Sequence, residues 1–178
     1  MKVKLFALLS TVLAGLVFGG NWNADASKAK VQFTVKGPFG TVHGNFSSLK
    51  ATIQFNEKDL AASSITASIG AETVSTGIGL RNSDLRKKEE WLNAPKFPVV
   101  SYKSQKIEKK GDGYLAVGEL TLKGITKAVE IPFTFSSSGS TGVFKGHFLI
   151  HRQDFKIGKP GGSVGEDISI DLEVPVSK

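Results

Sequence analysis

The residues with the widest chemical repertoire are three histidines, His43, His147 and His151, which could ligate a metal or act as general bases. His147 and His151 are four residues apart, a spacing that puts both on one face of a helix but separates them by about 13 Å along a strand. A shared zinc ion needs ligand bonds of about 2 Å. All three lie at the polar positions of alternating segments, where side chains face solvent. The sequence therefore predicts no metal site.

Recognisable catalytic patterns are also missing. There is no H-E-x-x-H, G-x-S-x-G or P-loop pattern, and Gly161-Gly162-Ser163 lacks the G-K-[ST] ending that holds a phosphate. The chain has no cysteine, which excludes disulfides, thiolate metal sites and thiol nucleophiles. We predict no catalytic residue, no cofactor and a protein that is not an enzyme. The alternative is an enzyme that acts on a small amphiphilic substrate in an apolar pocket.

Basic residues gather at Arg81, Arg86, Lys87 and Lys88, where they could bind an anionic head group. Two glutamates follow at once, so a solvated helix face is the alternative. Elsewhere the basic residues are scattered singly, and without Lys2 and Lys4 the net charge falls from +7 to about +5. This pattern predicts no nucleic-acid partner. Arg152 and Asp154 are expected to form a structural ion pair.

Most of the chain alternates apolar and polar residues, which is typical of half-buried antiparallel strands. The expected strands are Val31–Val35, Val42–Phe46, Leu49–Phe55, Ile65–Ile69, Val99–Ile107, Tyr114–Leu122, Val129–Phe135, Phe144–Ile150 and Ile168–Val176. They are separated by short turns rich in glycine, serine and charged residues. No repeat, linker or second domain is visible.

One stretch, Val74–Pro98, departs from this alternation. Its apolar residues recur at roughly helical spacing: Leu80, Leu85, Trp91 and Leu92. Ser83 and Asp84 are candidate N-caps, and two prolines end the segment. The sequence therefore predicts one short helical insertion near residues 80–94.

We expect an all-β protein, an antiparallel β-barrel of about eight strands, because the apolar faces carry large aromatic residues and glycines lie within the strands. A barrel of this size is just wide enough for one slim ligand. The alternative is a fully packed sandwich. The residues expected to line the interior are Phe33, Val35, Phe46, Ile53, Phe55, Ile69, Phe133, Phe135, Phe148 and Ile150. Several of them could instead simply fill the barrel.

The first 20 residues are expected to be a secretory signal peptide, and residues 21–178 a single domain. Lys2 and Lys4 precede an apolar run that is shorter than the roughly 20 residues of a membrane span. Cleavage is expected near Gly19 or Gly20. Cleavage at Ala26, which would remove Trp22, and an uncleaved anchor are the alternatives.

The mature protein is expected to be soluble and exported to the periplasm. The missing cysteine excludes a lipoprotein anchor. An integral outer-membrane barrel is the alternative, and lysines and glutamates on the outward face of the strands argue against it. We therefore expect no stable membrane insertion.

Five local patterns recur in order along the chain. They are Trp22-Asn23-Ala24-Asp25-Ala26-Ser27 leading into Val31–Val35, Val42-His43-Gly44-Asn45-Phe46, Ser75-Thr76-Gly77 with Arg81, Leu85 and Arg86, Gly118–Lys127 (GELTLKGITK), and Arg152-Gln153-Asp154-Phe155. Together they resemble the YceI family of periplasmic, lipocalin-like polyisoprenoid-binding proteins. The resemblance spans essentially the whole predicted mature chain.

This resemblance implies a lipocalin-like barrel that holds a long amphiphile, typically an isoprenoid chain, in its interior. It also makes Arg81 the best candidate for the head group, since that residue lies on a shared motif, and it leaves a homodimer open. The chain departs from the family at Asn82, Asp84 and Trp91-Leu92-Asn93, where Asp, His and an aromatic pair with Asp are usual. A different ligand or head-group preference is an expected consequence.

Overall fold

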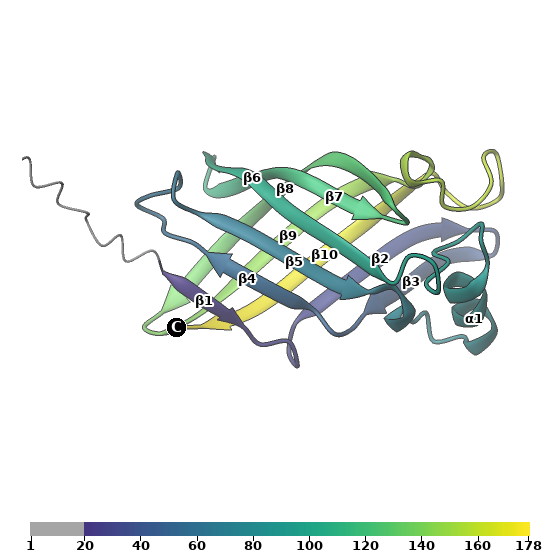
Figure 1. Cartoon of the computed structure of the whole chain (residues 1–178), viewed down its shortest axis with the longest axis horizontal. Coiled ribbons are helices and arrows are strands. Elements are labelled where there is room, and N and C mark those ends of the chain that lie inside the picture. Colours follow the sequence, from purple (N-terminus) through teal and green to yellow (C-terminus); the bar gives the residue numbers. More distant parts are fainter. Residues whose placement is uncertain (1–19) are drawn as a thin grey trace, which may run out of the picture.

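The computed structural model describes residues 20–178, so the expected signal peptide, apart from Gly20, lies outside the described residues. The described residues form ten strands, one α-helix and two short 3-10 helices (Figure 1). The strands are β1 (Asn21–Ala24), β2 (Lys30–Gly37), β3 (Gly40–Phe46), β4 (Lys50–Gln54), β5 (Ser64–Gly70), β6 (Val99–Lys110), β7 (Gly113–Leu122), β8 (Ile125–Ser138), β9 (Thr141–His151) and β10 (Asp167–Ser177). The helices are η1 (Ala71–Thr73), α1 (Gly79–Lys87) and η2 (Arg152–Phe155).

The strands close into a barrel in which two barrel strands are interrupted. β1 and β2 both pair with β10, while β4 pairs with β1 and β3 pairs with β2. Along the chain, β1 and β2 are therefore two parts of one interrupted barrel strand, and β3 and β4 are two parts of another. Counted in this way, eight antiparallel strands form a ring that closes where Asn23 faces Ser177. The predicted eight-stranded barrel is confirmed, and the sandwich alternative is wrong.

Alternation decides which side chains face the interior. Phe33 on β2 lies in register with Ile170 on β10 and Gly44 on β3, so all three positions face the same side of the sheet. A Cβ atom added to Gly44 would overlap the ring of Phe33. Gly44 therefore leaves room for that ring to lie flat over β3, which explains why a glycine interrupts an otherwise apolar face.

One end of the barrel is closed by an aromatic plug. The ring of Phe55 makes edge-on contacts with four other rings, with centroid distances between 4.9 and 5.6 Å. The plug consists of Trp22, Phe55, Tyr114, Phe133, Phe135 and Phe144. Trp22 also donates its indole N–H to the carbonyl of Phe55 at 3.2 Å. Trp22, at the very start of the barrel, is thus part of the packed domain.

The opposite end, here called the mouth, carries the β2–β3 turn, α1 and the loop between η2 and β10 (Figure 1). Helix α1 spans Gly79–Lys87 and begins after Ile78, with no side-chain cap. The predicted short helix is confirmed, but it ends at Lys87 and does not extend to residue 94, and the caps predicted at Ser83 and Asp84 are wrong because both residues lie inside the helix. Beyond Lys87 the chain turns back, because the amide of Ala94 bonds to the carbonyl of Arg86 at 2.7 Å. Among the described residues, no helix has the length and apolar composition that crossing a bilayer requires.

Phe55→Ala should destabilise the protein strongly. Phe55 is only 2% exposed and contacts four rings of the plug, so truncation leaves a cavity that its neighbours cannot fill. We expect a loss of about 3–5 kcal/mol in the free energy of unfolding, measured by urea denaturation. Leu149→Ala is the control, because Leu149 is 61% exposed and should cost little. Similar losses for both variants would contradict a tightly packed plug.

Candidate functional site

A cavity of about 260 Å³ occupies the interior of the barrel between the plug and the mouth. Its walls are almost entirely apolar, and all strands from β2 to β10 contribute to them. Typical ligand pockets begin at about 300 Å³, so this is a small cavity. It suits a thread-shaped apolar molecule better than a bulky ring system.

Eight of the residues that the sequence predicted for the interior line this cavity: Phe33, Val35, Phe46, Ile53, Ile69, Phe133, Phe148 and Ile150. Phe55 and Phe135 are not among the lining residues and belong to the plug. Phe133 and Phe144 belong to the plug and also line the cavity, so the plug forms one end wall of the cavity. Phe33, Phe46 and Phe148 line the cavity without contacting the plug ring of Phe55.

Many lining residues were not singled out from the sequence. Those on strands, and Leu49 directly before β4, occupy the same inward positions as the predicted ones: Val31, Leu49, Ala51, Ile65, Ala67, Val100, Tyr102, Ala116, Leu120, Leu122, Ile131, Phe144, Ile168, Ile170, Leu172 and Val174. Strict alternation along each strand was the signal that could have found them. The irregular segment after α1 also contributes Trp91 and Leu92, whose roughly helical spacing in the sequence does not correspond to a helix here.

Arg81, the predicted head-group residue, lies on α1 and not in the cavity wall. Its Nε donates to Thr76 Oγ1 at 2.9 Å, and Asn82 Oδ1 accepts from the amide of Thr76 at 2.8 Å. Arg81 and Asn82 thus hold the turn that leads into the helix. Arg86 lies closer to the cavity, since its Nη2 donates to the carbonyl of the lining residue Val74 at 2.7 Å. A head-group role for Arg81 stays a prediction.

Arg152 organises the loop between η2 and β10. It is 1% exposed, and its guanidinium donates to the carbonyls of Ile157 at 2.7 Å, Gly165 at 2.9 Å and Val164 at 3.0 Å. It also forms an ion pair with Glu166 at 2.9 Å, so the predicted pairing with Asp154 is wrong. Because its donors are engaged with the protein itself, Arg152 positions the loop over the cavity and does not offer an anion site.

The irregular segment after α1 and the loop between η2 and β10 meet to form a cap over the mouth side of the cavity. The amide of Gly158 donates to the carbonyl of Glu90 at 2.6 Å. Gly158 has a φ of +68°, and a Cβ there would crowd the indole of Trp91 at 2.9 Å. On the loop side, Lys123 Nζ donates to the carbonyl of Lys156 at 2.6 Å, and burial lowers the pKa of this amine. Hydrogen bonds, an ion pair between Lys159 and Glu90, and the buried side chains of Leu92 and Ile157 hold the two cap segments together and tie them to the rest of the barrel.

The histidines lie outside the cavity. His147 Nδ1 is 2.8 Å from Asp171 Oδ1, and His151 Nδ1 is 3.1 Å from Asp167 Oδ1, all on exposed side chains. Within residues 20–178, no group of three or more histidine or acidic side chains is placed to hold a metal ion.

Comparison with known proteins gives one family. A family model described as the YceI-like domain matches residues 22–176. A UPF0312 protein of Yersinia pestis (strain Pestoides F) is 27% identical over 181 residues, which cover 98% of this chain and 94% of the relative. A UPF0312 protein of Yersinia enterocolitica is also 27% identical, over 94% of this chain and 91% of the relative.

Solved structures share the fold. BcnA of Burkholderia cenocepacia superposes with a TM-score of 0.81 at 25% identity, over 88% of this chain and 100% of that protein. The YCEI protein of Campylobacter jejuni gives a TM-score of 0.69 at 22% identity, over 77% of this chain and 85% of that one. A polyisoprenoid binding domain from Saccharophagus degradans, implicated in plant cell wall breakdown, gives 0.66 at 14% identity, over 88% and 97%.

Arg152→Lys should destabilise the cap, although it keeps the charge. An ammonium group cannot reach the several carbonyls that the planar guanidinium satisfies, so buried acceptors are left without donors. We expect a loss of about 3 kcal/mol in the free energy of unfolding, and faster amide exchange in residues 156–165. Arg81→Lys, on the surface of α1, is the control with a smaller effect. Unchanged exchange in the loop would refute the role given to Arg152.

Both tyrosines of the chain should resist ionisation in the folded protein. Burial raises the pKa of Tyr102 to about 12. Burial, aided by a 2.7 Å hydrogen bond to Glu57, does the same for Tyr114. In the unfolded chain a tyrosine ionises near about pH 10. The neutral phenols therefore stabilise the fold fully below about pH 10, and this contribution is lost as the pH rises from about 10 to 12.

Phenolate absorbance during an alkaline titration measures this directly. The folded protein should show almost none at about pH 10, and the denatured protein should show a midpoint there. A midpoint near about pH 10 in the folded protein would mean that the two phenols are not buried.

Proposed function

We propose that this chain, which belongs to the YceI-like domain family, binds a long-chain amphiphile such as a polyisoprenoid inside its barrel and sequesters or carries it in the periplasm. The observation that carries the proposal is the small apolar cavity of about 260 Å³ between the plug and the mouth. The Saccharophagus degradans domain, described as polyisoprenoid binding, has the same fold and supports the ligand class.

The chemistry of the cavity matches this class of ligand. Burial of a methylene group gains about 0.8 kcal/mol, so each five-carbon isoprene unit gains roughly 4 kcal/mol before the entropy costs of binding. The lining offers almost no polar group that would have to be desolvated. A polar head group would then remain at the mouth, near the turn held by Arg81 and Asn82.

The proposed role is binding without catalysis. The side chains that face the cavity are almost all hydrocarbon, and the one buried cation among them, Arg152, is engaged with its own loop. Export through an N-terminal signal peptide is part of the proposal and rests on the sequence alone.

Lipid extraction from the natively purified protein is the first experiment. The chain, purified without detergent from cells that make polyisoprenoids, should release a prenyl lipid that mass spectrometry identifies. Protein that is recovered empty and that also fails to bind an added polyprenol would refute the proposal.

Ala67→Phe should block the cavity. Ala67 lies on the inner face of β5 and lines the cavity, so a phenylalanine there takes up space that the ligand needs. We expect at least about a tenfold loss of affinity for a fluorescently labelled polyprenol, a change of about 1.4 kcal/mol. Thr66→Phe is the matched control, because Thr66 is the adjacent, exposed residue on the outer face of the same strand. Equal affinities for the two variants would place the ligand outside the barrel.

A further inference from the structure

The mouth carries three large apolar side chains that have no covering partner among the described residues. Phe39 is 102% exposed, Leu80 is 77% exposed and Ile78 is 53% exposed. Phe39 lies in the turn between β2 and β3, and the other two lie at the start of α1. We call these three residues the apolar rim. Exposure of large apolar side chains to water is unfavourable, so a cluster of them indicates a surface that meets another apolar phase.

Hydrogen bonds hold the elements that carry the rim at the same end of the barrel. Asn45 on β3 forms a bridge with Ser75, three residues before Ile78. The amide of Gly165 donates to the carbonyl of Lys36 at 2.7 Å and ties the β2–β3 hairpin to the loop before β10. Figure 1 shows the hairpin tip and α1 together at the end opposite the two termini of the described barrel.

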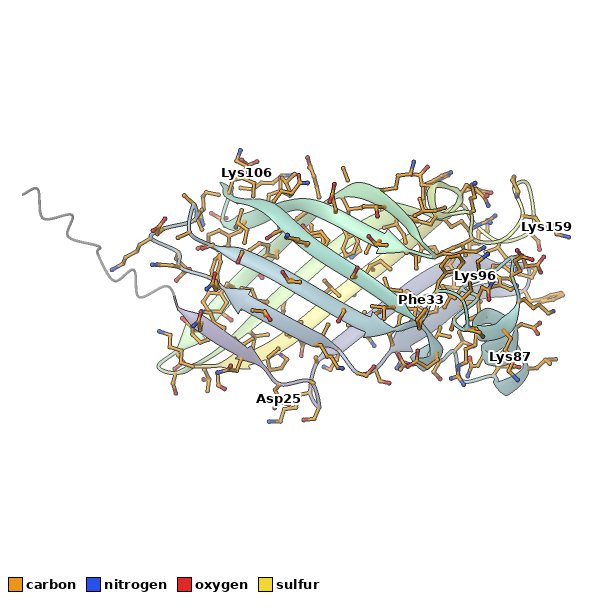
Figure 2. The ribbon with its side chains drawn as sticks, viewed as in Figure 1. Asp25, Phe33, Lys87, Lys96, Lys106 and Lys159 are labelled. Carbon is orange, nitrogen blue, oxygen red and sulfur yellow. The ribbon has the colours of Figure 1, made fainter. Side chains whose placement is uncertain are left out.

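Basic side chains accompany the rim. Lys36 precedes the turn that carries Phe39, Lys87 ends α1, and Lys96 follows in the irregular segment. Figure 2 shows Lys87, Lys96 and Lys159 at the mouth, with Lys106 at the far end. Within the described part of the chain, none of Lys36, Lys87 and Lys96 is paired with an acidic side chain. Their charges are therefore available to an anionic surface.

The combination fits a lipid bilayer better than a protein surface. Projecting apolar tips beside lysines are the usual composition of an interfacial membrane contact, where apolar side chains enter the acyl boundary and lysines stay among the head groups. Two separate tips, one on a hairpin and one on a helix start, also form no continuous flat face. The end that carries them is the end toward which the cavity extends, since the opposite end is sealed by the plug.

We propose that the apolar rim and its neighbouring lysines dock the protein on an anionic lipid bilayer, with the mouth facing the membrane. This proposal extends the proposed function. It rests on that function only for the purpose of docking, which is to let an apolar ligand pass between the bilayer and the cavity without crossing water. The contact itself needs no ligand in the cavity.

Flotation with lipid vesicles that contain no prenyl lipid tests the contact alone. The chain should float with vesicles of phosphatidylglycerol and phosphatidylcholine, more weakly with phosphatidylcholine alone, and less at high salt because the lysine contribution is screened. The double variant Phe39→Ser, Leu80→Ser should bind at least tenfold more weakly. Leu149→Ser, which removes an exposed leucine that points sideways from β9, should bind as the unaltered chain does.

A second variant and its matched control test the contribution of the lysine charges to vesicle binding. Lys87→Glu with Lys96→Glu should weaken binding to the anionic vesicles several-fold, whereas Lys110→Glu, at the plug end of β6, should not. A chain that does not float with either vesicle, or a rim variant that floats as well as the unaltered chain, overturns the proposal. Rim substitutions that dissociate an oligomer while leaving flotation unchanged also overturn it, since the rim would then be a protein interface.

Polyprenol retention separates this proposal from the function it extends. The rim variant should retain a bound polyprenol as well as the unaltered chain does, while Ala67→Phe should lose polyprenol and still float. Loss of flotation in Ala67→Phe to the same extent as in the rim variant would show that vesicle binding is a property of the filled cavity and would overturn a separate docking surface. Retained polyprenol in a chain that never floats would leave the proposed function intact and end the docking proposal.

Discussion

The aromatic plug is the packing arrangement on which the rest of this structure depends. An eight-stranded barrel has an interior that its own side chains can fill, or that can hold one slim ligand. Here Phe55 and five other aromatic side chains pack together at one end and fill the core there. With that end filled by side chains, the remaining interior can keep a cavity while the barrel keeps its shape. A stable closed end and an apolar open end are therefore two consequences of one uneven distribution of phenylalanine.

The mouth is held by a different kind of interaction. A chain without cysteine cannot cross-link its loops, and the cap here depends on one buried arginine and a few backbone hydrogen bonds. Arg152 gathers the carbonyls of the loop before β10, and Gly158 lets that loop approach Trp91. The cap also buries Leu92, Phe155 and Ile157 in the core, so polar and apolar contacts together hold this end of the barrel.

The two ends of the barrel carry different side chains, and this difference relates the cavity to the protein surface. At the plug end the large aromatic side chains are buried, whereas at the mouth Phe39 and Leu80 project into water beside lysines. A ligand that is insoluble in water has to be collected where it is soluble, and a bilayer is such a place. The end of the barrel that admits the ligand would then also bring the protein to the bilayer in which the ligand is dissolved.

Much of this molecule is encoded locally. Alternation along the strands already indicated the all-β fold, the inward residues such as Phe33 and Phe148, and the single helical break, because the side-chain direction of a strand depends only on odd and even position. The position of each residue along the barrel axis is not local. It depends on how far each strand is shifted against its neighbours, so Phe55 and Phe135 were indistinguishable in sequence from Phe33, although they belong to the plug. The partner of Arg152, the start of α1 and the place of Trp91 over the cavity likewise required tertiary structure, because each is decided by loops that approach one another only when the ring closes.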